Sequence, residues 1–148
     1  MTDLETIYKK FYRRCDSISL LSYDKEYRDN VTQDCLDEAI VQLTPYLEDD
    51  ISLEINEEES SFKTDLDKQI QYFLTELMFL SFIKRCRDRE ENTFNTLGTK
   101  DYTIYSPANL LNSLVTLVNT VSQEVFTDLN NYSTSSLKQK DLEEAIHG

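Results

Sequence analysis

The residue types that most often carry chemistry are sparse in this sequence, and their spacing matches no catalytic or metal-binding motif. The one histidine, His147, stands next to the last residue, so we do not expect a Ser-His-Asp or Cys-His arrangement. Cys15, Cys35 and Cys86 form no C-x-x-C pair, which argues against a zinc site or a disulfide framework and favours buried free thiols. The two glycines, Gly98 and Gly148, are too far apart to form a glycine-rich phosphate-binding loop. We therefore predict no enzyme, no metal and no cofactor.

Charge and composition narrow the class of protein further. The chain has 148 residues, the size of one ordinary domain, and carries 28 Asp and Glu against 15 Lys and Arg, for a net charge of −13. Such acidity disfavours binding to nucleic acid phosphates and to anionic membranes. No pair among these acids stands in an apolar setting that would raise a carboxyl pKa for catalysis. The acidic start predicts no signal peptide, and the longest apolar run, around Phe79–Ile83, is too short to span a bilayer.

Apolar residues at steps of three and four predict an all-α fold, a small helical bundle of about four main helices with long loops and a C-terminal tail. Two prolines and two glycines are too few for the tight turns of a β-sandwich or barrel. The predicted helices span residues 4–15, about 32–44, about 65–89, and from Ser106-Pro107 to about 130–132. The expected N-terminal caps are Thr2 in a capping box with Glu5, Asn30 or Thr32, Thr64 with Asp67, and Ser106.

The third predicted helix is apolar on every side from Leu77 to Ile83. A helix of this kind is buried in a bundle or shared with neighbouring subunits. Since no site accompanies it, the pattern favours an interaction protein that forms oligomers.

Three segments are expected outside these helices. Residues 48–64 are strongly acidic, and alternating apolar residues allow a small strand or an extended arm, although a solvated loop is the plainer interpretation. The candidate acidic contact arm comprises Glu54, Glu57, Glu58 and Glu59. Residues 92–105 are predicted to form a loop. Residues 133–148 follow the 1–132 domain as a flexible tail or as a short helix that folds on a partner, with Leu137, Leu142 and Ile146 on roughly one side.

The stretch LGTKDYTIYSPANLL, residues 97–111, resembles a signature of neck proteins from tailed phages of Gram-positive hosts. That signature has a Lys-Asp-aromatic step before Tyr-Ser-x-Ala-Asn, and the last long helix ends near a tyrosine. The matching residues are Lys100, Asp101, Tyr102, Tyr105, Ser106, Ala108 and Asn109, with Tyr132 at the far end. The resemblance covers roughly residues 30–132. Pro107, the acidic stretch and the tail depart from it.

The resemblance implies a head-to-tail connector, also called an adaptor, that catalyses no reaction. Typically twelve copies form a ring beneath the portal protein, and the ring receives a stopper or tail-completion protein. Twelve copies at −13 each would carry about −156 in formal charge, which suits a lumen that DNA passes without specific binding. The implied location is the virion neck, after assembly in the host cytoplasm. The implied interface residues are Lys100, Asp101, Tyr102, Tyr105, Ser106 and Asn109, and the tail is the candidate for portal docking.

Plainer roles and other functions stay open at this point. Tyr102 and Tyr105 could simply cover the start of the fourth helix, and Asp101 and Asn109 could satisfy backbone groups of that turn. The clustered acids of residues 48–59 would also suit an acidic DNA mimic that inhibits a host nuclease. A small regulatory helical bundle is the third hypothesis.

Overall fold

The computed structural model describes residues 1–15, 23–106 and 109–147, with side chains described as far as Ser135. Over these residues the fold is a small all-α bundle, as predicted, with one two-stranded sheet. The elements in chain order are α1 (Leu4–Arg14), α2 (Lys25–Leu43), the 3-10 helix η3 (Thr44–Tyr46), β1 (Ile55–Asn56), β2 (Ser61–Phe62), α3 (Lys68–Tyr105) and α4 (Leu110–His147).

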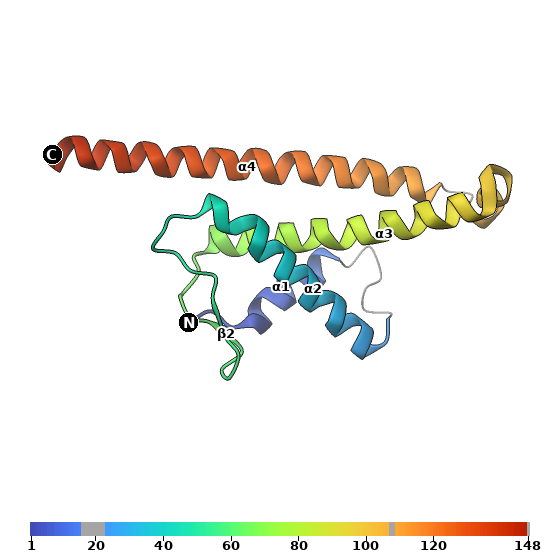
Figure 1. Cartoon of the computed structure of the whole chain (residues 1–148), viewed down its shortest axis with the longest axis horizontal. Helices are drawn as coiled ribbons and strands as arrows, with labels where there is room; N and C mark the ends of the chain where they lie inside the picture. Colours follow the sequence, from blue (N-terminus) through green and yellow to red (C-terminus); the bar gives the residue numbers. More distant parts are fainter. Residues whose placement is uncertain (16–22, 107–108, 148) are drawn as a thin grey trace.

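The two long helices α3 and α4 run side by side along the long axis of the molecule and form a helical hairpin (Figure 1). Helices α1 and α2 pack against the first half of α3, and η3 contacts α4. The distal half of the hairpin, around the reversal between α3 and α4, extends beyond α1 and α2 (Figure 1). The bundle is therefore thickest in its middle, with the reversal projecting at one end and the C-terminal part of α4 at the other (Figure 1).

The core is centred on the first half of α3, which is buried on every side as its composition predicted. Seven consecutive residues, Leu77 to Ile83, are buried, because α1, α2 and α4 all pack on this part of the helix. The Arg14 guanidinium lies 4.0 Å from the centre of the Phe79 ring, and Phe11 meets Phe82 edge-on at 6.2 Å between ring centres. This packing explains the apolar run within a single chain, so the run by itself does not require a neighbouring subunit.

The helix starts agree with the sequence in part. Of the predicted pair Thr64 and Asp67, Asp67 is the N-cap of α3, its carboxylate accepting a hydrogen bond from the Ile70 amide at 2.8 Å, so the helix begins at Lys68 and Thr64 precedes it. Helix α2 begins at Lys25 rather than near residue 32, because Asp24 supplies the cap instead of Asn30 or Thr32. Residues 16–22 of the predicted connection lie outside the described residues.

The capping box predicted for α1 is absent. Asp3 is the N-cap residue of α1 and makes no side-chain capping bond. The Thr2 hydroxyl instead accepts a hydrogen bond from the Leu66 amide at 2.9 Å. This long-range contact takes Thr2 away from its local role and ties the chain start to the approach to α3.

Two other boundaries differ from the prediction. The loop expected over residues 92–105 is helical, and α3 reaches Tyr105 with one break at Gly98, where φ is 80° and ψ is 170°. The fourth helix, expected to end near residues 130–132, continues to His147. Between residues 110 and 147 the sequence holds neither glycine nor proline, so no local signal ends the helix.

Candidate functional site

Tyr102, from the phage-like signature, lies at the centre of the reversal between α3 and α4. Its side chain is 4% exposed and packs edge-on against Phe94, with 5.3 Å between ring centres. Its hydroxyl donates a hydrogen bond to the buried Glu90 carboxylate at 3.1 Å and accepts one from the Leu111 amide at 3.0 Å. One phenol therefore joins the helix before Gly98, the turn after it and the start of α4.

Two further residues of the signature cap α4. The Ser106 hydroxyl accepts a hydrogen bond from the Leu110 amide at 3.1 Å, so Ser106 supports the helix start although α4 begins only at Leu110. The Asn109 side-chain oxygen accepts a hydrogen bond from the Asn112 amide at 3.3 Å. Asn109 has a positive φ of 53°, a backbone conformation that asparagine tolerates better than most residues. These bonds agree with the plainer roles predicted for two residues: Tyr102 covers the start of α4, and Asn109 satisfies a backbone group of the turn. Pro107 and Ala108 lie outside the described residues.

The other three residues of the signature face outward. Lys100, Asp101 and Tyr105 are all exposed, and Tyr105 retains 59% of its accessible surface. Within the part of the chain that the structure describes, Asp101 makes no side-chain hydrogen bond that would satisfy the turn. The signature thus divides into an inner set that builds the reversal and an outer set that is free for contacts.

The acidic contact arm is a short hairpin rather than a structureless loop. β1 pairs antiparallel with β2, Ile55 opposite Phe62 and Asn56 opposite Ser61, and Asp3 adds an isolated bridge to Ser61. Glu54 is exposed and forms an ion pair with Lys63 at 3.4 Å. Glu57, Glu58 and Glu59 occupy the exposed turn of the hairpin. Buried Phe62 anchors the other side, so three carboxylates are held outward on a fixed scaffold.

The predicted tail belongs to α4 in the structure. Leu137, Leu142 and Ile146 fall within the helix, but their side chains lie outside the described residues. The described apolar stripe of α4 ends at buried Leu129 and at Tyr132, whose ring lies 5.5 Å from that of Phe73. Residues after Ser133 are thus not required for the described packing of the bundle.

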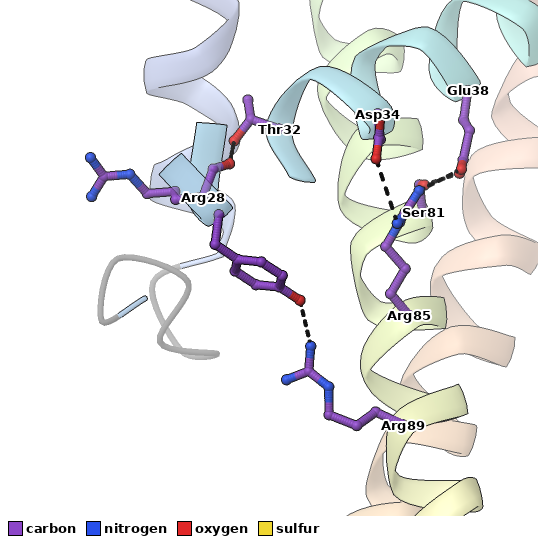
Figure 2. A network of polar contacts seen from close by, with 8 residues as sticks. Arg28, Thr32, Asp34, Glu38, Ser81, Arg85 and Arg89 are labelled. Atoms are coloured by element: carbon purple, nitrogen blue, oxygen red, sulfur yellow. Dashed lines mark hydrogen bonds and ion pairs between the residues drawn. The ribbon is translucent and has the colours of Figure 1, made fainter. Parts of the chain in front are cut away.

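A polar cluster that the sequence did not reveal joins α2 to α3 (Figure 2). The Ser81 hydroxyl donates a hydrogen bond to Glu38, and Arg85 donates one to the same carboxylate at 2.7 Å. Asp34 is a second, longer ion-pair partner of Arg85, at 3.9 Å. The only local signal was a serine inside an otherwise apolar run, which does not identify its partner.

The same face continues into a groove of about 820 Å³ lined by Arg85, Arg89 and Tyr105, among others. Arg89 donates hydrogen bonds to the Tyr23 and Tyr27 hydroxyls, each at 2.7 Å. Both arginines of this groove already have partners within the chain. They serve to hold α2 and the segment before it on α3, and they do not form an open anion site.

All three cysteines are free thiols, and the predicted burial holds for two of them. Cys15 and Cys35 are buried and Cys86 is half-buried. Burial raises the pKa of all three thiols, that of Cys35 to about 11. Because the thiolate is the reactive form, these groups are poor nucleophiles and poor metal ligands at neutral pH.

Neither a metal site nor a membrane span emerges from the described residues. No group of three or more His, Cys, Asp or Glu side chains among them is placed to hold a metal ion. Within the same described part of the chain, each helix is too short or too polar to cross a bilayer. Comparison of the chain with known proteins found no matching family model, no similar curated protein and no similar solved structure.

Proposed function

We propose that this chain is a head-to-tail connector of a tailed phage, an adaptor that forms a ring beneath the portal, extends the DNA channel and receives a stopper or tail-completion protein. One observation carries the proposal: the segment that resembles the neck-protein signature forms the reversal between the two longest helices. Tyr102, Ser106 and Asn109 hold that reversal together, while Lys100, Asp101 and Tyr105 stay exposed. Loops carried on a rigid scaffold are common binding elements.

The acidic hairpin supports an adhesive role of this kind. Glu57, Glu58 and Glu59 project from a turn whose base is fixed by backbone bonds to the chain start, from Leu4 N to Ser60 O at 3.0 Å and from Phe62 N to Thr2 O at 2.8 Å. A fixed acidic projection suits contact with a basic surface of a neighbour or an edge of a channel that repels DNA. It lies beside the start of α1 in the thick part of the bundle, away from the reversal between α3 and α4 (Figure 1).

The test is co-purification with the structural proteins of the phage that encodes the chain. Tagged full-length protein would be expressed during infection, and the retained proteins identified by mass spectrometry. Retention of the portal protein together with a tail-completion protein is the expected result. Failure to retain the portal would contradict the proposal, and retention of a host nuclease in its place would favour the DNA-mimic alternative.

A matched pair of variants tests the part played by the reversal. Tyr105 and Tyr72 are both tyrosines of α3, 59% and 49% exposed. Tyr105→Ala is expected to reduce recovery of portal or tail-side partner several-fold, whereas Tyr72→Ala is expected to leave it unchanged. Equal recovery with both variants would place the partner contact elsewhere on the molecule.

Truncation after Tyr132 tests the tail. The described buried residues of α4 all precede this point, so the shortened chain is expected to fold, with a circular dichroism spectrum and melting transition close to those of the full chain. Docking through the tail predicts that it no longer binds the portal. Undiminished portal binding would exclude the tail as the docking segment and leave the connector proposal itself intact.

A further inference from the structure

The helical turn of α3 after Gly98, at its reversal into α4, carries exposed charged and large apolar side chains. Lys100, Asp101, Ile104 and Tyr105 stand at positions i, i+1, i+4 and i+5 of the helical turn after Gly98, so they share one side of it. Ile104 is 72% exposed and Tyr105 is 59% exposed, which is unusual for two such large apolar side chains in adjacent positions. We call these four residues the tip face.

The charge pattern around the tip face differs from that of the rest of the chain. From Asn92 to Gln123 the sequence contains no charged residue except Lys100 and Asp101, and these two cancel. The net charge of −13 therefore comes entirely from the remainder of the molecule. Two copies of the chain repel one another when they approach through most of their surface, but not when they approach through this half of the hairpin.

The two charges of the tip face have no partner within the described residues. Lys100 and Asp101 form no ion pair with each other in the described structure, unlike the adjacent residues Arg87 and Asp88 earlier in α3. A partner surface of one sign would satisfy one of them and repel the other. A second copy related by a two-fold axis would satisfy both, because in such a contact each residue meets its counterpart reciprocally.

We propose that the tip face is a two-fold self-association site, in which Lys100 of each copy pairs with Asp101 of the other while Ile104 and Tyr105 cover each other. The contact is small compared with a standard interface of about 1,600 Å², so we expect a weak dimer with a dissociation constant of about 10 µM to 1 mM. The inference does not rest on the connector proposal, since it concerns the purified free protein.

Charge exchange tests the pairing directly. The dissociation constant would be measured by sedimentation velocity from about 5 µM to 1 mM. Lys100→Asp and Asp101→Lys each place like charges across the two-fold axis, and each is expected to weaken the dimer about ten-fold or more. An equimolar mixture of the two single variants restores opposite charges at every pair and is expected to recover association. The double variant K100D/D101K should also recover it.

Two controls keep the result independent of folding. Lys100 and Asp101 are exposed, so every charge variant should keep the circular dichroism spectrum and melting temperature of the parent chain. Ile104→Ser should weaken the dimer without changing its response to charge exchange. A parent chain that is monomeric up to 1 mM, or weakening by the single variants with no recovery in the mixture, would overturn the proposal. Portal capture would be unaffected by that outcome, so the two proposals can fail separately.

Discussion

The two halves of α3 are both helical, apart from the break at Gly98, but they have very different surroundings. From Ile70 to Ile83 the helix is enclosed by α1, α2 and α4, and most of its side chains are buried. Beyond Glu90 it has α4 as its main neighbour, and Tyr102 is the one residue of this half that is buried. The first half is held by apolar packing, and the second depends on a few hydrogen bonds around one phenol. The scaffold and the contact surface are thus separate parts of one helix.

The largest expected effect comes from removing a core side chain in the enclosed half. Leu77 is fully buried, and Leu77→Ala should lower the free energy of unfolding by about 2–5 kcal/mol through lost burial and a cavity. Leu97→Ala makes the same chemical change in the distal half, where Leu97 is 37% exposed, and should cost less than about 1 kcal/mol. Urea unfolding of both variants measures the contrast. Similar losses would show that the distal half packs as tightly as the first.

The second-largest loss of unfolding free energy is expected at Tyr102, whose hydrogen bonds hold the distal half together. Tyr102→Phe removes the hydroxyl and leaves the buried Glu90 carboxylate without that donor, which should cost about 1–3 kcal/mol. Tyr105→Phe is the matched control, because Tyr105 is exposed, and its effect should stay within about 0.5 kcal/mol. Hydrogen exchange of the amides near Leu111 should accelerate in Tyr102→Phe alone. Equal protection in both variants would contradict the role of the phenol as a joint.

A smaller loss of unfolding free energy is expected from substituting Gly98, where α3 is broken. Gly98 has a φ of 80° and a ψ of 170°, a region that is essentially restricted to glycine, while a Cβ added there meets nothing within 4 Å. Gly98→Ala should therefore cost about 1–2 kcal/mol through backbone strain alone. Thr99→Ala, at the next exposed position, serves as the control. If Gly98→Ala were as stable as the parent chain, the break would not be fixed by the backbone conformation of this residue.

The smallest effect is a dependence of the unfolding free energy on pH. It arises from Cys35 of α2, which is buried in the core. Burial raises the pKa of Cys35 from 9.0 to about 11, so the folded state holds this proton more tightly than the unfolded state. The resulting stability is fully present below pH 9 and is lost as the pH rises toward 11, with about 1 kcal/mol lost at pH 10.

Cys35→Ala isolates this contribution from the tyrosines that titrate nearby. The difference in unfolding free energy between parent and variant should shrink by that amount between pH 7.5 and pH 10. A difference that stays constant over this range would show that the thiol does not ionise on unfolding.

Local patterns predicted the elements whose physical causes are local. The apolar run from Leu77 to Ile83 predicted a buried helix segment, and Asp67 of the predicted Thr64–Asp67 pair is the residue that caps α3. The signature also directed attention to the segment that forms the reversal. It could not separate Tyr102 from Tyr105, since both are tyrosines on one helix and differ only in which side of it they occupy.

Errors arose where distant contacts overrode a local signal. Gly98 suggested a loop, yet helix persists on both sides of it because Tyr102 packs on Phe94 and binds Glu90. Thr2 forms no capping box, because its hydroxyl accepts a hydrogen bond from the distant Leu66 amide instead. The early part of α2, with Tyr27, is held on α3 by Arg89, sixty-two positions away in the sequence.

The sequence alone determined that this protein is an acidic, helical chain with a buried third helix, because composition and apolar period are sums over neighbouring residues. The tertiary structure alone decided which side chains of the reversal are inside it and which are exposed. That choice depends on where Glu90 and the start of α4 are placed in space, and only the packed hairpin fixes those positions.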